Sequence, residues 1–342
     1  MREAATMAND LPLPSQQLVT VFGGSGFVGR HVVRALVKRG YRVRVAVRRP
    51  DLAGFLQPLG TVGQIHAVQA NLRYPASVTA AVTGASAVVN LVGILQEGGR
   101  QSFAGVQASG ARIVAQACAA AGITRLVQVS AIGAASDSAS LYARSKAEGE
   151  AAVQAAMPSA IVLRPSIVFG PEDGFFNRFA ALARMLPALP LVGGGETKFQ
   201  PVFVGDVAEA VARAVEGRVG EGLIYEMGGP QVKTFRELVS YICEVTGRKP
   251  LLVPLPFPLA RIQARLLETV DLLSLGLLPD VLKLTRDQVT LLESDNVVSA
   301  EAVAQGRSFE ALGIEPASVE AIVPSYLWRF RKTGQFDTAR AG

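Results

Sequence analysis

The hydrophobic positions of the chain alternate between two periods over its first half. Short β-branched runs are each followed by a longer stretch with helical spacing of apolar residues. The expected strands are 18–22, 42–47, 64–68, 86–93, 126–130 and 160–164, and the expected helices include 27–40, 110–123 and 142–156. This alternation predicts an α/β protein with a doubly wound parallel sheet covered by helices on both faces.

The alternation loosens after about residue 170. The expected elements there are a helix at 175–185, a glycine-rich loop at 191–196, a strand at 198–204, a helix at 206–217 and a strand at 222–229. From Lys233 onward the pattern is mostly helical. We therefore expect a smaller, helix-rich C-terminal lobe beside the sheet.

Three glycines join the first expected strand to the first expected helix. Gly23, Gly26 and Gly29 have the spacing G-x-x-G-x-x-G in the sequence GGSGFVG. The first would permit a tight turn, the second would let the backbone approach a pyrophosphate, and the third would let the helix pack closely on the strand. Phosphate oxygens would then bind the free N–H groups near Phe27. The loop predicts dinucleotide binding, and the simpler interpretation is a glycine-rich turn.

The second expected strand ends at Arg48 and Arg49, where an NAD site would place an acidic residue on the ribose 2′-hydroxyl. A guanidinium group suits a 2′-phosphate, so this pair favours NADP(H) over NAD(H). The alternative is a pair of solvated surface arginines. Asn71 and Leu72 follow the third expected strand, where contacts to adenine would fall, and 90–93 would line the middle of the cofactor.

Tyr142 and Lys146 lie four residues apart in an expected helix, and so on one face of it. An ammonium group beside a phenol lowers the phenol pKa from about 10, which makes a usable proton donor or acceptor. These two residues are the candidate catalytic residues. Any exposed helix can contain the Y-x-x-x-K spacing, but it is more specific after the fifth strand of a dinucleotide-binding fold.

Composition narrows the classes of function further. The chain of 342 residues is 49% hydrophobic, with a mean hydropathy of +0.31, which leaves apolar surface for a partner or a membrane. Its net charge is +6, yet no dense basic run is typical of nucleic-acid binding. Cys118 and Cys243 share no short spacing with the histidines, so we expect neither a metal site nor a disulfide.

We expect neither a secretory signal nor a membrane span in this chain. The N-terminal residues have no apolar core of the kind a signal peptide contains. The apolar stretch 256–282 is interrupted by charged residues and by a proline. It is better interpreted as an apolar helix that packs on something, in a protein that is intracellular and soluble or peripheral to a membrane.

These motifs resemble the extended and atypical branches of the short-chain dehydrogenase/reductase superfamily. Further matches are LVQVSA at 126–131, LRPSIVFGP at 163–171 and PVFVGDVAEA at 201–210. In extended members, serines after strand five include one that polarises the substrate oxygen. Ser130 matches the first serine, but Ala131 and Ile132 follow, and isoleucine cannot donate a hydrogen bond. Loss of such a group typically costs about 10²–10⁴-fold in rate.

Two C-terminal stretches, 285–298 and 312–334, resemble one atypical family in particular. It is the nucleotide-binding accessory subunit of respiratory complex I (alpha-subcomplex subunit nine) with its bacterial relatives. The resemblance implies NADPH held as a non-exchanging ligand on the peripheral arm, near the quinone module and the membrane surface. It implies complex I subunits as partners, no nucleic acid, and a peripheral location on the cytoplasmic side of the inner membrane, or otherwise in the cytoplasm.

The same resemblance assigns individual residues to the cofactor. Around the adenine ribose and pyrophosphate it places Gly23, Ser25, Gly26, Phe27, Val28, Gly29 and Arg48. Around the nicotinamide half it places Leu91, Val92, Gly93, Ser130, Tyr142, Lys146, Pro165 and Ile167.

Different classes of function remain open at this point. Ile132 and the C-terminal stretches favour an accessory or assembly subunit of complex I that holds NADP(H) without turnover. The complete Tyr142 and Lys146 pair favours an NADP-dependent short-chain dehydrogenase/reductase or a nucleotide-sugar epimerase/dehydratase. A redox-sensing regulator that binds NADP without turnover differs from the first class only in its partner.

The expected organisation is a Rossmann NADP-binding domain and a smaller lobe. Residues 1–16 are a flexible tail, 17–170 with 205–229 form the Rossmann domain, 171–204 with 230–334 form the lobe, and 335–342 are a second tail. Tyr326, Trp328 and Phe330 near the C-terminus are typical anchors of an interface. The alternative is that Leu327, Trp328 and Phe330 cover the protein's own core.

Overall fold

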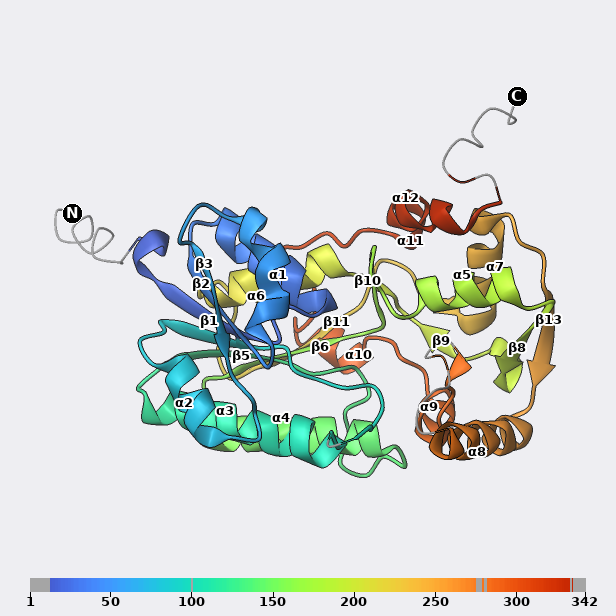
Figure 1. Ribbon diagram of the computed structural model, residues 1–342, viewed down its shortest axis with the longest axis horizontal. Helices are drawn as coiled ribbons and strands as arrows, with labels where there is room; N and C mark the ends of the chain where they lie inside the picture. Colours follow the sequence, from blue (N-terminus) through green and yellow to red (C-terminus); the bar gives the residue numbers. More distant parts are fainter. Residues whose placement is uncertain (1–12, 100, 275–278, 280–281, 333, 335–342) are drawn as a thin grey trace.

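The computed structural model describes residues 13–99, 101–274, 279, 282–332 and 334 (Figure 1). The expected C-terminal tail and most of the expected N-terminal tail lie outside the described residues. So does part of the apolar stretch 256–282.

Seven parallel strands form the central sheet, in the spatial order β11-β6-β5-β4-β1-β2-β3. Their bounds are β1 (Leu18–Phe22), β2 (Arg42–Val47), β3 (Ile65–Gln69), β4 (Ala87–Asn90), β5 (Arg125–Val129), β6 (Ile161–Pro165) and β11 (Ile224–Met227). The direction of chain progression reverses between β1 and β4, which is where doubly wound sheets bind dinucleotides. The predicted fold class is confirmed.

Helices cover both faces of this sheet (Figure 1). On one face lie α1 (Phe27–Lys38) and α6 (Val204–Val215), and on the other α2 (Pro75–Val82), α3 (Ser109–Ala120) and α4 (Leu141–Ala156). Val88 and Val89 are neighbours in β4, and both are fully buried, one in each of the two cores. Burial on both sides explains why the strands appear in the sequence as nearly continuous apolar runs.

The smaller lobe is built around α5 (Phe176–Met185) and α7 (Phe235–Thr246). Its core contains a cluster of aromatic rings, namely Phe175, Phe176, Phe179, Phe199 and Phe235. The two-stranded parallel sheet of β8 (Ala188–Val192) and β13 (Leu251–Leu255) lies at its outer side, followed by α8 (Phe257–Leu273) and α9 (Arg286–Leu291). The expected domain boundaries stay a prediction.

Short elements complete the fold. They are β7 (Val168–Phe169), β9 (Lys198–Phe199), β10 (Val202–Phe203), β12 (Lys233–Thr234), α10 (Ala300–Ala304), α11 (Val319–Ile322) and α12 (Pro324–Leu327). Helical turns of the 3₁₀ type occur at Pro14–Gln16, Pro50–Leu59, Gly193–Gly195 and Trp328–Phe330.

One expectation for the second half of the chain is wrong. The single strand expected at 198–204 is interrupted at Pro201, which has no N–H to donate, and β9 and β10 pair with different partners, β12 and β7. The region after Lys233 is mostly helical as expected, but it also contains a strand that was not predicted, β13 at residues 251–255. A short apolar run of this length does not distinguish a strand from a buried helix by its periodicity.

The α8 helix presents an apolar stripe to solvent. Its small residues Ala260 and Ala264 are fully buried against the protein. Five large apolar side chains, 49% to 78% exposed, recur at helical spacing along another face; they are Leu259, Ile262, Leu266, Val270 and Leu273. We call these five residues the α8 stripe. Among the described helices, none has the length and apolar character to cross a membrane.

Candidate dinucleotide site

The carboxyl ends of the parallel strands meet at one edge of the sheet. Phe22 at the end of β1 lies opposite Ala46 of β2 and Asn90 of β4, and Val129 at the end of β5 lies opposite Leu163 of β6. The loops that follow these strands therefore lie next to one another. The predicted cofactor residues fall in these loops, at the end of β6, or at the starts of the helices that follow.

The glycine loop has the backbone geometry that its sequence suggests. Gly23 has a φ of 77°, and its carbonyl oxygen accepts a hydrogen bond from the N–H of Gly26 at 3.0 Å. The α1 helix begins at Phe27 with no acidic residue in its first turn, so its positive end is available to an anion. A Cβ at Gly29 would lie 2.2 Å from the Gly23 oxygen. Gly29 thus lets α1 pack on the loop itself, rather than on the strand as expected.

The two arginines after β2 differ in their surroundings, although both are exposed. Arg49 is paired with Asp51, with Nη2 to Oδ2 at 2.7 Å and Nε to Oδ1 at 3.1 Å. Within the part of the chain that the structure describes, Arg48 has no ion pair or hydrogen bond through its side chain. Of the pair, Arg48 is the guanidinium free to meet a phosphate.

The residues after β3 are already engaged in the protein. The Asn71 Oδ1 accepts a hydrogen bond from the N–H of Arg73 at 3.1 Å, and its own N–H donates to Ser77 Oγ at 3.0 Å. Leu72 is 7% exposed and packs in the core beneath α2 and α3. These contacts form a fixed turn, and Leu72 offers little surface to an adenine ring.

The segment after β4 touches both the glycine loop and α4. A Cβ at Gly23 would lie 3.3 Å from Cγ2 of Val92, and a Cβ at Gly93 would lie 3.1 Å from Nζ of Lys146. The glycine loop and the lysine of α4 therefore meet the same short segment. This arrangement places the two predicted halves of the site within reach of one extended ligand.

Ser130 supplies a test of whether a cofactor fits. Its Oγ is buried and has no hydrogen-bond partner among the described residues. Buried hydroxyl groups in proteins are nearly always hydrogen-bonded, so this one needs a partner that the chain does not supply. The ribose or carboxamide of a nicotinamide nucleotide has both donors and acceptors. Together with the glycine loop, this unpaired hydroxyl fits a bound nicotinamide dinucleotide.

Tyr142 and Lys146 share one face of α4. Nζ of Lys146 lies 5.8 Å from the centroid of the Tyr142 ring, and Phe103 packs edge-on against that ring with centroids 5.9 Å apart. Burial, together with the nearby carboxylate of Asp287, raises the pKa of Tyr142 to about 12. Burial lowers the pKa of Lys146 to about 8.

The expectation that Lys146 lowers the pKa of the Tyr142 phenol is therefore wrong. The lysine nitrogen lies over the ring, and burial and the Asp287 carboxylate both disfavour the phenolate.

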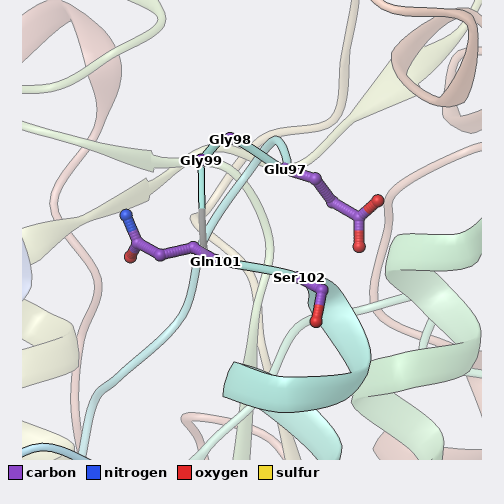
Figure 2. A pocket seen from close by; sticks show the side chains of 5 residues that line it. All are labelled: Glu97, Gly98, Gly99, Gln101 and Ser102. Atoms are coloured by element: carbon purple, nitrogen blue, oxygen red, sulfur yellow. The ribbon is translucent and has the colours of Figure 1, made fainter.

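A hairpin after β4 brings Phe103 to Tyr142. Its residues line a cavity of about 420 Å³, namely Glu97, Gly98, Gly99, Gln101 and Ser102 (Figure 2). Figure 2 shows the side chains of Glu97 and Gln101 pointing to opposite sides. The Glu97 Oε1 accepts a hydrogen bond from the N–H of Phe103 at 2.7 Å. A π-helical turn at Ala104–Ala108 follows, a feature that is frequent near functional sites.

Two residues of the C-terminal stretch 285–298 reach the site and were not among the predicted site residues. Asp287 accepts hydrogen bonds from backbone N–H groups at the start of α4, including that of Tyr142 at 3.3 Å. The side chain of Asn296 donates from Nδ2 to the carbonyl oxygen of Ile132 at 3.1 Å. A capping box of the form T-x-x-Q predicts where α9 begins, but no sequence signal places it against α4.

A doubly wound parallel sheet, a three-glycine loop and a Y-x-x-x-K helix together define a nicotinamide-nucleotide-binding protein of the short-chain dehydrogenase/reductase type. The chain belongs to the NAD dependent epimerase/dehydratase family, which matches residues 19–228. The resemblance to this superfamily is confirmed.

The most informative relatives include both a respiratory subunit and an enzyme. The NADH dehydrogenase [ubiquinone] 1 alpha subcomplex subunit 9 of Arabidopsis thaliana is 34% identical over 320 residues, which cover 93% of this chain and 79% of the relative. The ceramide reductase of Caulobacter vibrioides is 34% identical over 243 residues, which cover 70% and 74%.

Among solved structures, the Escherichia coli NADPH-dependent quinone oxidoreductase QOR2, complexed with NADPH, aligns with a TM-score of 0.69 at 21% identity. The alignment covers 91% of this chain and 99% of that one. At this identity the likeness shows the fold alone. The narrower resemblance to the subunit-nine family is confirmed by the Arabidopsis relative.

Proposed function

We propose that this protein is an accessory or assembly subunit of NADH:ubiquinone oxidoreductase (complex I) that holds NADP(H) without turnover. The observation that carries this proposal is the similarity to the Arabidopsis subunit 9 over 93% of the chain. An alignment of 320 residues extends far beyond residues 19–228, so it includes most of the smaller lobe. The likeness therefore extends over 79% of that subunit and not merely over a shared nucleotide-binding fold.

The site supports retention of the nucleotide over catalysis. At the position where extended enzymes polarise the substrate, Ile132 has no donor in its side chain. Its backbone is also occupied, because its N–H donates to Pro165 and its carbonyl accepts from Asn296. Burial raises the pKa of Tyr142 to about 12, farther from neutral pH than that of an ordinary phenol, which is less favourable for acid–base work there.

Arg48 supports NADP(H) as the form that is held. We expect Arg48→Ala to weaken NADPH binding by about tenfold or more while leaving NADH binding nearly unchanged, since only the former has a 2′-phosphate. Arg49→Ala is the matched control, because Arg49 is already paired with Asp51. Isothermal titration with both nucleotides measures the four affinities. If Arg48→Ala still bound NADPH more tightly than NADH by the wild-type ratio, Arg48 would not be the residue that binds the 2′-phosphate.

The partners we propose are subunits of the peripheral arm near the quinone module, with the α8 stripe against the membrane surface beside them. Both acidic side chains of α8 are ion-paired, Glu268 with Arg286 at 2.8 Å and Asp271 with Lys283 at 3.5 Å. The stripe therefore offers apolar side chains without an unpaired negative charge on its helix, which suits an anionic lipid surface. The location we propose is peripheral, on the cytoplasmic side of the inner membrane.

Purification from native membranes tests the main proposal. The tagged protein is expected to co-elute with complex I in mild detergent and to retain NADPH, identified by mass and absorbance, through gel filtration. Tyr142→Phe should keep both properties, since the tyrosine does no chemistry in this proposal. A protein that elutes alone and exchanges added NADPH within seconds would contradict it.

A second candidate function, an NADP-dependent reductase or epimerase, is favoured by the complete Tyr142 and Lys146 pair and by the ceramide reductase relative. It predicts steady NADPH oxidation with a carbonyl substrate and its abolition in Tyr142→Phe. The same purified protein therefore distinguishes the two functions, because one requires a retained nucleotide and the other a nucleotide that is consumed and replaced.

A further inference from the structure

Residues 285–299, which we call the strap, connect the smaller lobe to the edge of the central sheet. The strap begins with α9, which lies beside α8 (Figure 1). It continues to Ser299, whose N–H donates to Glu226 of β11 at 2.8 Å. Its side chains make two sets of contacts with segments that belong to the candidate nucleotide site.

The first set joins Asp287 to the start of α4, the helix that carries Tyr142 and Lys146. One carboxylate oxygen accepts a hydrogen bond from the N–H of Leu141 at 2.6 Å. The other accepts from Ser140 Oγ at 2.9 Å and from the N–H of Tyr142 at 3.3 Å. A negative charge at this end of a helix also complements the helix dipole.

The second set joins Asn296 to the ends of two strands of the sheet. Its Nδ2 donates to the carbonyl oxygen of Ile132 after β5. Its Oδ1 accepts from Ser166 Oγ after β6 at 2.6 Å, and its backbone oxygen accepts from the same hydroxyl at 2.9 Å. Ser166 is 5% exposed, so this link lies inside the protein.

These contacts reach three of the four segments that should enclose the nicotinamide half of the cofactor, and the fourth is 91–93 after β4. Ile132 is two residues from Ser130, Asp287 bonds to Tyr142 directly, and Ser166 lies between Pro165 and Ile167. The three segments come from different strands and helices, and one continuous piece of chain holds them together.

We infer that the strap keeps the nicotinamide half of the nucleotide from leaving, and that Asp287 is the positioning residue on which this retention depends. The inference rests on the proposed function, in which the nucleotide is held without exchange. A ligand enclosed by three segments dissociates only when they separate, so contacts between the segments govern the release rate more than the association rate.

The experiment measures how fast NADPH leaves. Protein loaded with radiolabelled NADPH is mixed with excess unlabelled NADPH, and the label that stays bound is followed over time. Because hydrogen bonds to a charged acceptor are among the stronger ones, Asp287→Asn is expected to release NADPH at least about tenfold faster than the wild-type protein.

Two comparisons separate this role from a general loosening of the fold. Asp295→Asn is the matched control: Asp295 lies in the same strap and accepts the N–H of Lys198 at 2.8 Å, but that contact leads to β9 and not to the nicotinamide segments. It should release NADPH at the wild-type rate. The fragment 2′,5′-ADP lacks the nicotinamide half, so its affinity should be the same in Asp287→Asn and the wild type.

Unchanged NADPH release from Asp287→Asn would overturn the inference, and so would equal acceleration by Asp295→Asn or equal weakening of 2′,5′-ADP. If Asp287→Asn does not fold, Asn296→Ala tests the second anchor with the same expected result. Wild-type protein that binds no NADPH would overturn the proposed function and the strap together. If the wild-type protein retains NADPH and the folded variants release it at the wild-type rate, only the inferred role of the strap would be overturned.

Discussion

Removing one oxygen atom from Tyr326 tests how the C-terminal residues are held against the smaller lobe. Its Oη donates to Oδ2 of Asp173 at 2.6 Å, and the two side chains are buried, at 6% and 3% exposure. Asp173 also accepts the N–H groups of Gly170 at 3.1 Å and Asn177 at 3.2 Å. Tyr326→Phe leaves these two donors in place and removes the third.

The free energy of unfolding that Tyr326→Phe loses depends on the charge of Asp173. Burial raises the pKa of Asp173 above its ordinary 3.8, although its hydrogen bonds act in the opposite direction. Native protein therefore binds this proton more readily than the unfolded chain does, and stability falls as pH rises from about 4 through the raised native pKa. Loss of the Tyr326 donor raises the pKa of Asp173 further, so the variant loses most stability at pH values where the carboxylate is ionised.

We expect Tyr326→Phe to lower the free energy of unfolding by about 2 kcal/mol at pH 7.5, the range for a hydrogen bond to a charged group. As the pH approaches 4, the partner becomes a neutral acid and the loss should shrink toward about 1 kcal/mol. Urea unfolding followed by circular dichroism at several pH values measures both quantities.

The matched control is Tyr225→Phe, which removes a buried phenol oxygen that accepts a hydrogen bond from a neutral group, the N–H of Gly220 at 3.0 Å. The free energy of unfolding that this variant loses should not change with pH over the same range. A Tyr326→Phe loss that is equally constant would refute the argument, because it would mean that the charge of Asp173 plays no part in holding the C-terminus.

Three further changes test other parts of the structure. Gly29→Ala should cost about 1–3 kcal/mol and weaken NADPH binding, because its Cβ meets backbone at 2.2 Å; Gly54→Ala, with open space around it, should melt like the wild type. Leu266→Glu in the α8 stripe should abolish co-sedimentation with anionic vesicles, whereas Val232→Glu, at another exposed apolar position, should not. Lys146→Met should stabilise the nucleotide-free protein by up to about 3 kcal/mol at pH 7, as judged by thermal melting. This gain should vanish above about pH 11, where the unfolded lysine, with its ordinary pKa of 10.5, is also mostly neutral, and NADPH binding should weaken at every pH.

The sheet could be predicted from sequence because its central strands are buried on both faces and its strands are bounded by turn residues. The same reasoning failed where local pattern and tertiary pairing diverge. Pro201 separates β9 from β10 within what appeared to be one strand, and β13 exists only through its pairing with β8, more than fifty residues earlier in the chain. Its proline and its short length gave no periodicity to detect.

Whether the apolar residues near the C-terminus cover the protein's own core could likewise be decided only from the structure. Leu327 is fully buried and Tyr326 nearly so, which supports the interpretation that they cover the protein's own core, while Trp328 keeps 38% of its surface exposed. The sequence pattern of these residues is the same in either case.

The candidate site also contains some residues that could be found from sequence and others that could not. The glycine loop and the spacing of Tyr142 and Lys146 are local signals, so sequence was enough to find them. Asp287 lies 145 residues from Tyr142 along the chain, and no local pattern indicates that the two meet. The direction of the Tyr142 pKa shift could not be predicted either, because it follows from burial, which only the folded chain determines.

In the proposed function, Asp287 connects retention of the nucleotide to weak acid–base chemistry. Acid–base catalysis is most effective when the pKa of the group lies near the working pH, whereas burial first and the Asp287 carboxylate second raise the pKa of Tyr142 to about 12. That carboxylate is also what binds the strap to α4. In the proposed function, the contact that encloses the nicotinamide half therefore also favours the protonated phenol. Because burial is the larger cause of the raised pKa, removal of the negative charge at position 287 should lower the pKa of Tyr142 only part of the way toward its ordinary 10.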